Sequence, residues 1–375
     1  MDAAERAAWL RLLLTPGLGP RTARELLAAF GLPQQVFDAG RTALKKHVAD
    51  DLASVLSHAA SAAIDSAVAS AEQWLAAATD RSLLTLADAD YPAGLLECPD
   101  PPPVLFAWGQ REALARPSLA IVGSRSCTQQ GRETAEAFAH ALAQAGLTIV
   151  SGLAVGIDAA AHRGALRAAD AGAAATTIAV LGTGVDVIYP SAHRALTDAI
   201  RTRGLLLSEF APGTPALAHN FPRRNRLIAG LTRGVLVVEA ALRSGSLITA
   251  RLAAELGREV LAIPGSIHSP TARGCHRLIK DGAKLVESAQ DVLSELRLPA
   301  GTPTAIAAAA GTGGGAVLSE TQREVLDVLG HDPVGLDTLI MRCARDAGAV
   351  SAALFELELA QHVERLPGNR YQRLR

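Results

Sequence analysis

The stretch from Phe221 to Leu252 reads FPRRNRLIAGLTRGVLVVEAALRSGSLITARL, and it indicates the fold and the binding site together. It opens with a basic cluster, and no acid occurs before Glu239. The members of this cluster are Arg223, Arg224, Asn225, Arg226 and Arg233. An apolar strand from Val235 to Val238 follows, and the small residues Ser244-Gly245-Ser246 form a turn before the next helix. Basic side chains beside a strand, a turn and a helix are typical of phosphate sites, so the stretch points to nucleotides or a nucleic-acid strand.

Outward from this stretch, short apolar runs alternate with helical patterns between residues 119 and 286. Short continuous apolar runs are typical of strands that are buried on both faces. Their alternation with helices predicts βαβ units and an α/β fold with a doubly wound, mostly parallel sheet. The expected strands are Leu119–Gly123, Leu147–Val150, Thr177–Leu181, Leu205–Ser208, Val235–Glu239, Val260–Ile263 and Lys284–Val286. The helices between them include Arg132–Gln144 and Thr249–Leu256.

Four of the expected strands end in small or polar residues. Ligands of doubly wound sheets bind at the carboxyl ends of the strands, and glycine there lets a phosphate approach the backbone. The four strand ends read Gly123-Ser124-Arg125, Ser151-Gly152-Leu153, Gly182-Thr183-Gly184 and Ser208-Glu209. A tight turn alone would explain the glycines at any one of these ends. The prediction of a phosphate site therefore depends on all four ends meeting at one edge of the sheet.

The net charge of the chain is −1, but the charged residues are unevenly distributed along it. Residues 113–298 hold twenty bases and fourteen acids, whereas residues 41–112 hold five bases and ten acids. A polyanion is therefore expected to bind the middle segment. Aromatic residues make up only 3% of the chain, so a long platform for stacking bases is not expected.

Cysteine usage and hydropathy bear on the compartment. The four cysteines lie far apart and form no CxxC pair, which predicts reduced thiols in a cytoplasmic protein rather than a disulfide framework or a metal site. They are Cys98, Cys127, Cys275 and Cys343. The N-terminus does not resemble a signal peptide, and no apolar stretch is long enough to span a bilayer, so no membrane partner is expected.

A small C-terminal domain is expected over residues 317–375, after an uncharged linker over residues 299–316. Three helical patterns and a hairpin predict the winged-helix layout. The helical patterns are Ser319–Leu329, Leu336–Arg345 and Ser351–Leu359, and the hairpin strands are Val363–Leu366 and Arg370–Leu374. The third helix holds Glu356 and Glu358 but no Lys or Arg, so we expect this domain to contact protein rather than DNA.

The N-terminal residues 1–80 are expected to form a helical domain. The turn Thr15–Pro20 lies between the helical patterns Arg6–Leu14 and Arg21–Phe30. A helix-hairpin-helix, which offers backbone N–H groups to a DNA phosphate, and a structural SAM-like bundle explain this pattern equally well. Residues 41–112 are expected to continue the helices and then become proline-rich, so the α/β domain of residues 81–298 carries an N-terminal extension.

Six ordered motifs in the middle segment resemble the DNA-processing protein A family, DprA, also called Smf. They are IVGSR (Ile121–Arg125), SGLAVGIDAAAH (Ser151–His162), VLGTGVDVIYP (Val180–Pro190), FPRRNRLIAGL (Phe221–Leu231), VEAALRSGSLITA (Val238–Ala250) and REVLAIPG (Arg258–Gly265). The resemblance covers the central segment densely, and the flanking domains match the three-part architecture of many members. It implies a Rossmann-like central domain.

The resemblance also implies a function. Members of the family are cytoplasmic proteins that bind single-stranded DNA, protect the incoming strand during natural transformation and load the RecA recombinase onto it. They act as homodimers, without an established catalytic role and without a cofactor or metal. The DNA-binding residues that this chain is then expected to use are Gly123, Ser124, Arg125, Ser151, Gly152, Gly182, Gly184, Arg194, Arg223, Arg224, Asn225, Arg226, Ser244, Gly245 and Ser246. About six cationic contacts for each protomer would make the affinity fall steeply with salt.

Other interpretations of the same residues stay open at this point. Arg226 or Arg233 could pair with acids such as Glu209 or Glu239 and stabilise the edge of the sheet. Tyr189 and Phe221 could each stack a base, although core packing is the simpler expectation for Phe221.

Two enzyme classes are weaker alternatives. A nucleotide phosphoribohydrolase on the same fold carries a PGGxGTxxE signature, and the nearest stretch, Pro264–His268, lacks its second glycine, threonine and glutamate. A dinucleotide-binding oxidoreductase would need a third glycine where this chain has Val187. Four acids could serve acid–base catalysis but are more simply explained as helix caps or ion-pair partners. They are Asp158, Asp186, Glu209 and Glu239.

Overall fold

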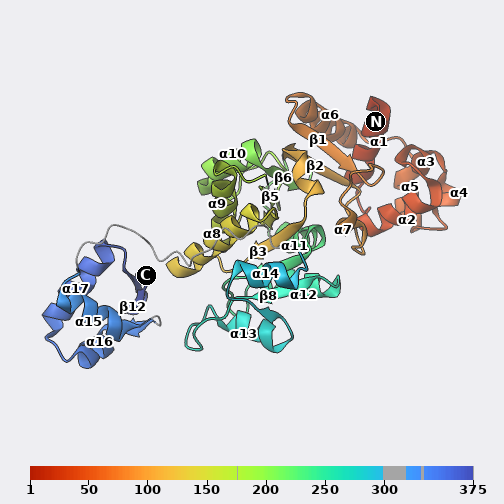
Figure 1. Cartoon of the computed structure of the whole chain (residues 1–375). Helices are drawn as coiled ribbons and strands as arrows, with labels where there is room; N and C mark the ends of the chain where they lie inside the picture. The colour runs from red at the N-terminus through yellow and green to blue at the C-terminus, as the bar shows by residue number, and fades with distance from the viewer. Residues whose placement is uncertain (175, 299–317, 331–332, 375) are drawn as a thin grey trace.

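The computed structural model of the chain describes residues 1–174, 176–298, 318–330 and 333–374. The expected linker, residues 299–316, lies outside these ranges. The N-terminal helices and the C-terminal domain lie at opposite ends of the molecule, with the central sheet between them (Figure 1). The division into domains at residues 80, 298 and 316 stays a prediction.

The central domain is built on a nine-stranded sheet in the order β1-β2-β6-β5-β4-β3-β7-β8-β9. All neighbouring strands from β6 to β9 in this order pair in parallel. The parallel strands are β3 (Ser118–Val122), β4 (Thr148–Ser151), β5 (Thr177–Val180), β6 (Leu205–Ser208), β7 (Gly234–Val237), β8 (Glu259–Ala262) and β9 (Lys284–Leu285). This arrangement confirms the predicted doubly wound, mostly parallel sheet. The chain leaves β3 for β4 on one side, and β7 lies on its other side, so the carboxyl ends of β3 and β7 form the switch point at which such sheets bind ligands.

Two antiparallel strands extend the sheet where helices were expected. Strand β1 (Arg81–Thr85) pairs with β2 (Val104–Gly109), and β2 pairs with β6. The prediction that helices continue through residues 41–112 is therefore wrong from Arg81 onward. The run VLFAWG of β2 is largely buried between the prolines before it and the glycine that ends it, which is the pattern of a core strand.

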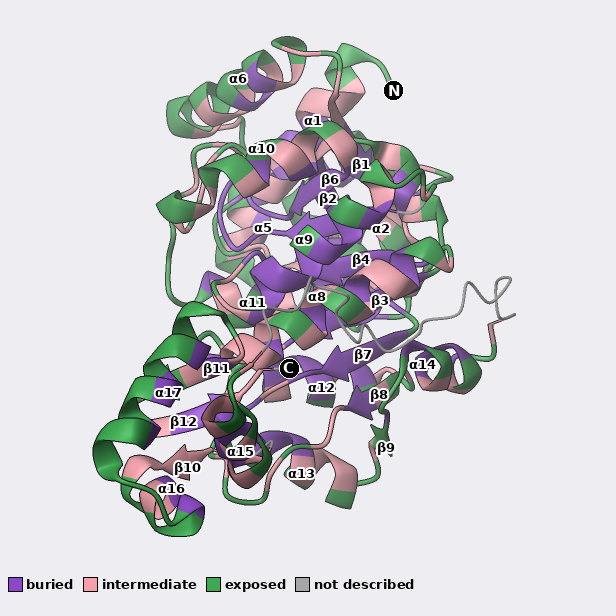
Figure 2. Ribbon diagram, turned by 60° about the vertical axis from the view of Figure 1, so that its left-hand side comes forward, coloured by how far each residue is buried: buried purple, intermediate pink, exposed green. Residues whose placement is uncertain are grey.

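Helices cover both faces of the sheet because successive side chains of a strand point to opposite faces. In β3, Leu119 and Ile121 pack on one face against α8 (Gln129–Gln144) and α9 (Ile157–Asp170). The alternate residues of β3 face the other side, which is covered by α11 (Asn220–Leu231), α12 (Ser246–Glu255) and α13 (Arg273–Lys280). Figure 2 shows the buried strands between these two layers. The remaining helices of this domain are α7 (Ala93–Leu96), α10 (Arg194–Arg203) and α14 (Ala289–Glu295).

The N-terminal residues form a helical cluster that shares its core with the antiparallel edge of the sheet. Trp9, Leu26 and Phe106 belong to one buried cluster. The helices are α1 (Ala3–Leu14), α2 (Pro20–Phe30), α3 (Pro33–Asp38), α4 (Arg41–Leu44), α5 (Asp50–Ser57) and α6 (Ala62–Ala76). No single helix in the described ranges is long and apolar enough to cross a membrane, and only the bent pair of α5 and α6 passes that test jointly.

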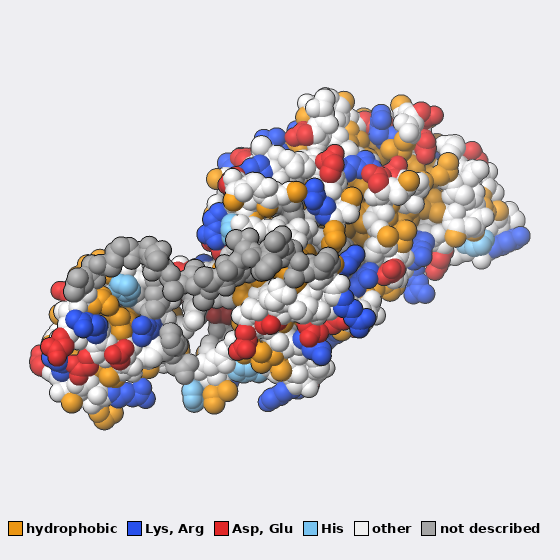
Figure 3. Space-filling model, in the orientation of Figure 1, with side chains coloured by type: hydrophobic (Ala, Val, Ile, Leu, Met, Phe, Trp, Pro, Cys, Tyr) orange, Lys and Arg blue, Asp and Glu red, His pale blue; other side chains and the backbone are white. Residues whose placement is uncertain are grey.

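The C-terminal residues fold as a winged helix, as predicted. Its helices are α15 (Glu320–Leu329), α16 (Leu336–Cys343) and α17 (Ala347–Leu359), and its sheet contains β10 (Val334–Gly335), β11 (Val363–Leu366) and β12 (Arg370–Arg373). Strand β12 lies between β10 and β11, and Val325, Leu339 and Leu354 fill the core. On the face seen in Figure 3, acidic and basic side chains are interspersed over this domain, which is unlike the single-sign surface of a DNA-reading domain.

Candidate nucleic-acid interface

An open groove of about 800 Å³ lies at the carboxyl ends of β3, β4 and β7, at the predicted position in the fold. Eight of the predicted DNA-binding residues line it. They are Gly123, Ser124, Arg125, Arg224, Asn225, Ser244, Gly245 and Ser246. The sheet thus brings together the VGSR turn, the RNR segment and the SGS turn from three separate parts of the chain.

The turn that carries Arg125 is fixed from two sides. The backbone N–H of Ser124 donates a hydrogen bond to the Glu239 carbonyl oxygen at 2.7 Å, and the N–H of Ile157 donates to the Ser124 carbonyl oxygen at 3.2 Å. Gly156 has a φ of +84°, and a Cβ atom there would lie 2.3 Å from the Ser124 oxygen. The Arg125 side chain is exposed and forms no ion pair with any described residue, so its guanidinium is free to bind an anion.

Arg243 lines the same groove as Arg125 and lies in the segment between β7 and α12. It precedes the SGS turn, in which the Ser244 and Ser246 hydroxyl groups lie 2.7 Å apart. The Arg243 side chain is exposed, and within the described part of the chain it has no acidic partner. Arg243 was not among the predicted site residues, although the ALRSGS sequence places it directly before the turn.

Arg224, the first arginine of the RNR core, is buried beneath the groove with only 4% of its surface exposed. Its guanidinium donates hydrogen bonds to the carbonyl oxygen of Gly152 at 2.8 Å and to that of Val180. Burial lowers the pKa of Arg224 to about 10, and the neighbouring carboxyl of Asp158 opposes this shift. A Cβ atom on Gly152 would lie 2.4 Å from the guanidinium, so this glycine makes room for the arginine rather than for a phosphate. Arg224 therefore positions the ends of β4 and β5.

Arg226 and Arg223 both pair with Glu209 at the end of β6. The nitrogen–oxygen distances are 2.5 Å for Arg226 and 3.0 Å for Arg223. Arg226 also contacts Asp100 at 3.2 Å, which joins α11 to the proline-rich segment before β2. The alternative that Arg226 pairs with Glu209 is thus confirmed. Arg233 is exposed and does not pair with Glu239 among the residues described.

Two aromatic rings line the groove beside the arginines. The rings of Tyr189 and Phe221 are 5.3 Å apart, and 51% of Tyr189 is exposed. Phe221 packs closely on Gly182, where a Cβ atom would lie 2.8 Å from the ring. Tyr189 is therefore the ring that is available for stacking on a base, and Phe221 supports it.

The other predicted residues lie away from the lining of the groove. The Ser151 hydroxyl is buried and donates to the Ile121 carbonyl oxygen at 2.7 Å, and a Cβ atom on Gly184 would lie 2.7 Å from the Ala211 oxygen. Arg194 is exposed at the start of α10 but is outside the lining. The residues in this group are Ser151, Gly152, Gly182, Gly184, Arg194, Arg223 and Arg226.

The four acids considered for catalysis are all engaged by the protein. Asp158 accepts the Gly152 N–H at 3.1 Å, and burial raises the pKa of its carboxyl. Asp186 accepts the Gly213 N–H at 2.8 Å, and Glu209 binds the two arginines. Glu239 accepts the hydroxyl and N–H of Thr128 at the start of α8. The expectation of an ion-pair role is thus confirmed for Glu209, and Glu239 binds the N-cap residue of α8. Asp158 and Asp186 instead accept backbone N–H groups of loops. No cluster suited to a metal ion occurs in the described ranges.

The fold and the site define a Rossmann-like protein with an open groove that presents unpaired arginines at a switch point of the sheet. The chain matches the family described as DNA recombination-mediator protein A over residues 82–297 and the DprA winged helix domain over residues 307–369. It belongs to the DprA/Smf family, whose members are DNA-binding recombination mediators rather than enzymes.

Individual relatives agree with this assignment. The DNA processing protein DprA of Streptococcus pneumoniae is 51% identical over 211 residues, which span 56% of this chain and 73% of that protein. The crystal structure of the S. pneumoniae protein has a TM-score of 0.62 and 39% identity, and the match covers 79% of this chain and 99% of that one. A Helicobacter pylori structure, described by its single-stranded DNA binding mode, has a TM-score of 0.52 and 29% identity over 58% of this chain and 95% of that one.

Proposed function

We propose that this chain binds single-stranded DNA along the groove, with the phosphates between Arg125 and Arg243. The observation that carries this proposal is that both guanidinium groups line the groove without an acidic partner in the described residues. Arginine binds phosphate oxygens through paired hydrogen bonds and stays charged at any working pH. The H. pylori relative, described by its binding of single-stranded DNA, supports the same ligand class.

Binding should be independent of sequence, because the groove offers groups suited to phosphates and a single exposed ring rather than a set of base-reading side chains. Tyr189 would stack on one base, which a duplex does not present to the protein. The preference for a single strand over a duplex follows from this contact.

The biological role that we propose is that of a cytoplasmic mediator in natural transformation. The chain would protect an incoming single strand and load RecA recombinase onto it, acting as a homodimer. The family description as a recombination mediator supports this role. The C-terminal domain would contact protein, since α17 exposes Phe355 (61%) and Leu359 (70%) beside Glu356 and carries no base.

Fluorescence anisotropy with labelled single-stranded and duplex oligonucleotides of equal length tests the binding. The wild type should prefer the single strand, and Arg125→Ala and Arg243→Ala should each weaken binding. Arg163→Ala is the matched control, because Arg163 is exposed and unpaired in the described structure but lies outside the groove. Equal affinity of all four proteins would reject the groove as the site.

A separate assay tests the mediator role. RecA filament formation should be measured on single strands coated with a single-strand-binding protein. The wild type should accelerate it, and Arg125→Ala should not. Light scattering at micromolar concentration tests the dimer, and a monomer mass there would reject it.

A further inference from the structure

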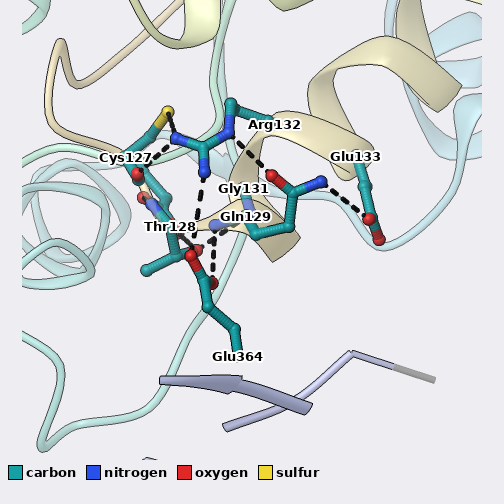
Figure 4. A network of polar contacts seen from close by, with 8 residues as sticks. Cys127, Thr128, Gln129, Gly131, Arg132, Glu133 and Glu364 are labelled. Carbon is teal, nitrogen blue, oxygen red and sulfur yellow. Dashed lines mark hydrogen bonds and ion pairs between the residues drawn. The ribbon is translucent and has the colours of Figure 1, made fainter. Parts of the chain in front are cut away.

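The wing of the C-terminal domain is docked on the first turn of α8. The Glu364 carboxylate of β11 accepts the backbone N–H of Gln129 at 3.0 Å, and its other oxygen lies 3.7 Å from the Arg132 guanidinium (Figure 4). Gln372 of β12 donates to the Gln130 side-chain oxygen at 2.6 Å. Both strands of the hairpin therefore contact the same end of α8.

The groups that hold Glu364 are also held in place by contacts within the central domain. Arg132 donates to the Gln129 side-chain oxygen at 2.9 Å and to the Cys127 carbonyl oxygen at 3.1 Å. Thr128 caps the helix by accepting the Gly131 N–H at 2.9 Å. A fixed guanidinium beside an N–H that has no partner within its own helix is a place where an anion is stabilised. The carboxylate of Glu364 thus occupies a position that suits one phosphate oxygen.

This contact lies next to the groove along the edge of the sheet. Gln129, the first residue of α8, is only four residues from Arg125, which lies in the connection between β3 and α8. Thr271 lines both the groove and a cavity of about 250 Å³ that is bounded by α8 on one side and by Pro333 and Gln372 of the C-terminal domain on the other. A strand that leaves the groove past Thr271 would therefore meet the docked hairpin.

The ion pair between Glu364 and Arg132 can be displaced by a competing anion. The Glu364 side chain is 24% exposed and that of Arg132 is 36% exposed, so solvent and salt reach both partners. The C-terminal domain carries seven bases and nine acids, whereas the central segment is basic. A polyanion therefore competes with the C-terminal domain for the basic side chains of the central segment.

We infer that Glu364 is an autoinhibitory latch, which holds the winged-helix domain across the path of the DNA and is displaced by a phosphodiester that takes its place on Gln129 and Arg132. This inference rests on the proposed function. In the docked state the hairpin borders the cavity next to the groove, and its Glu364 and Gln372 side chains are engaged by α8. When DNA binds, the latch opens and frees the wing and its domain. By linkage, weakening the latch raises the affinity for DNA, because a larger fraction of the protein is open.

The test uses the full chain in three forms, namely wild type, Glu364→Gln and Glu358→Gln. Glu358 is the matched control, because it is an exposed acid of the same domain whose side chain forms no hydrogen bond or ion pair within the described structure. Domain separation is followed by energy transfer between dyes on Ser294→Cys and Ser351→Cys, which replace exposed residues, while the four native cysteines are buried. Affinity for a single-stranded oligonucleotide is measured by anisotropy.

We expect Glu364→Gln to bind about two- to fivefold more tightly than the wild type, which is the effect of losing one partly exposed charge pair, and Glu358→Gln to match the wild type. Energy transfer should fall in Glu364→Gln without DNA, and in the wild type on adding DNA. Unchanged energy transfer on saturation with DNA, or equal affinity of Glu364→Gln and Glu358→Gln, would overturn the latch while leaving the proposed function intact. A wild type that binds no single strand would overturn both.

Discussion

Arg224 and Gly152 are joined by a hydrogen bond of 2.8 Å that crosses the floor of the groove, from α11 to the end of β4. The same guanidinium reaches the end of β5 at Val180. Because both acceptors are carbonyl oxygens at the carboxyl ends of parallel strands, Arg224 supplies donors that the sheet itself cannot provide there. Within the RNR segment, Arg224 and Asn225 both line the groove, and Arg224 also binds the ends of the strands beneath it.

Arg224→Ala should destabilise the protein, because it leaves two buried carbonyl oxygens without their donor and removes the positive charge near the buried Asp158 carboxyl. We expect a loss of about 3 kcal/mol in the free energy of unfolding, measured by urea denaturation. Arg125→Ala should stay within about 0.5 kcal/mol of the wild type, since Arg125 is exposed and unpaired among the described residues. Equal stability of the two variants would show that Arg224 has no structural role.

The salt dependence of DNA binding should show that Arg125 and Arg243, the two unpaired arginines of the groove among the described residues, contact phosphates. With Arg223 and Arg226 paired to Glu209, fewer cations are available than the sequence alone suggested. Each phosphate contact contributes about 0.7 to the slope of log affinity against log salt for a single strand. Arg125→Ala and Arg243→Ala should each reduce the slope by about that amount, as measured by anisotropy over a salt series. A slope that stays unchanged in both variants would argue against phosphate contacts at these side chains.

Tyr189→Ala should weaken binding of a single strand by about 1–3 kcal/mol, because the exposed ring would lose one stacked base. Tyr189→Phe keeps the ring without the hydroxyl and should bind like the wild type. Anisotropy with the same oligonucleotide measures both. If Tyr189→Phe lost as much affinity as Tyr189→Ala, the hydroxyl rather than stacking would account for the contact.

The parallel part of the sheet could be predicted because most of its strands are short apolar runs that precede or follow a helix. The groove could be predicted as well, since the ends of parallel strands meet at one edge. The antiparallel strand β2 was missed because the prolines before it suggested irregular structure. Helix α11 was not among the helices named from the sequence, and it begins with Pro222 in its first turn, where proline is tolerated.

The burial of Arg224 could not be predicted, because its hydrogen-bond partners lie 72 and 44 residues away along the chain. A sequence shows where a charge is but not whether an acid or a carbonyl group meets it. For the same reason Arg243, which stays unpaired in the described structure, was overlooked in favour of Arg223 and Arg226, which are paired.

His162 should make the stability of the fold depend on pH. The ring is fully buried, its Nδ1 lies 2.7 Å from the Thr177 hydroxyl, and its Nε2 has no hydrogen-bond partner among the described residues. Burial, with the nearby charges of His193 and Arg224, lowers the pKa of His162 to about 3 from 6.5. Between these values the unfolded chain binds more protons than the folded one, so the free energy of unfolding falls as the pH falls.

The expected loss is about 2 kcal/mol between about pH 7.5 and about pH 5, since each pH unit below the unfolded pKa of 6.5 costs about 1.4 kcal/mol. Urea denaturation of the wild type at the two pH values measures it. His162→Asn removes the titrating group and should abolish most of this dependence, whatever its own cost at neutral pH. His219→Asn, at an exposed position, should keep the dependence of the wild type. A loss of stability on acidification that is as large in His162→Asn as in the wild type would assign the effect to other groups.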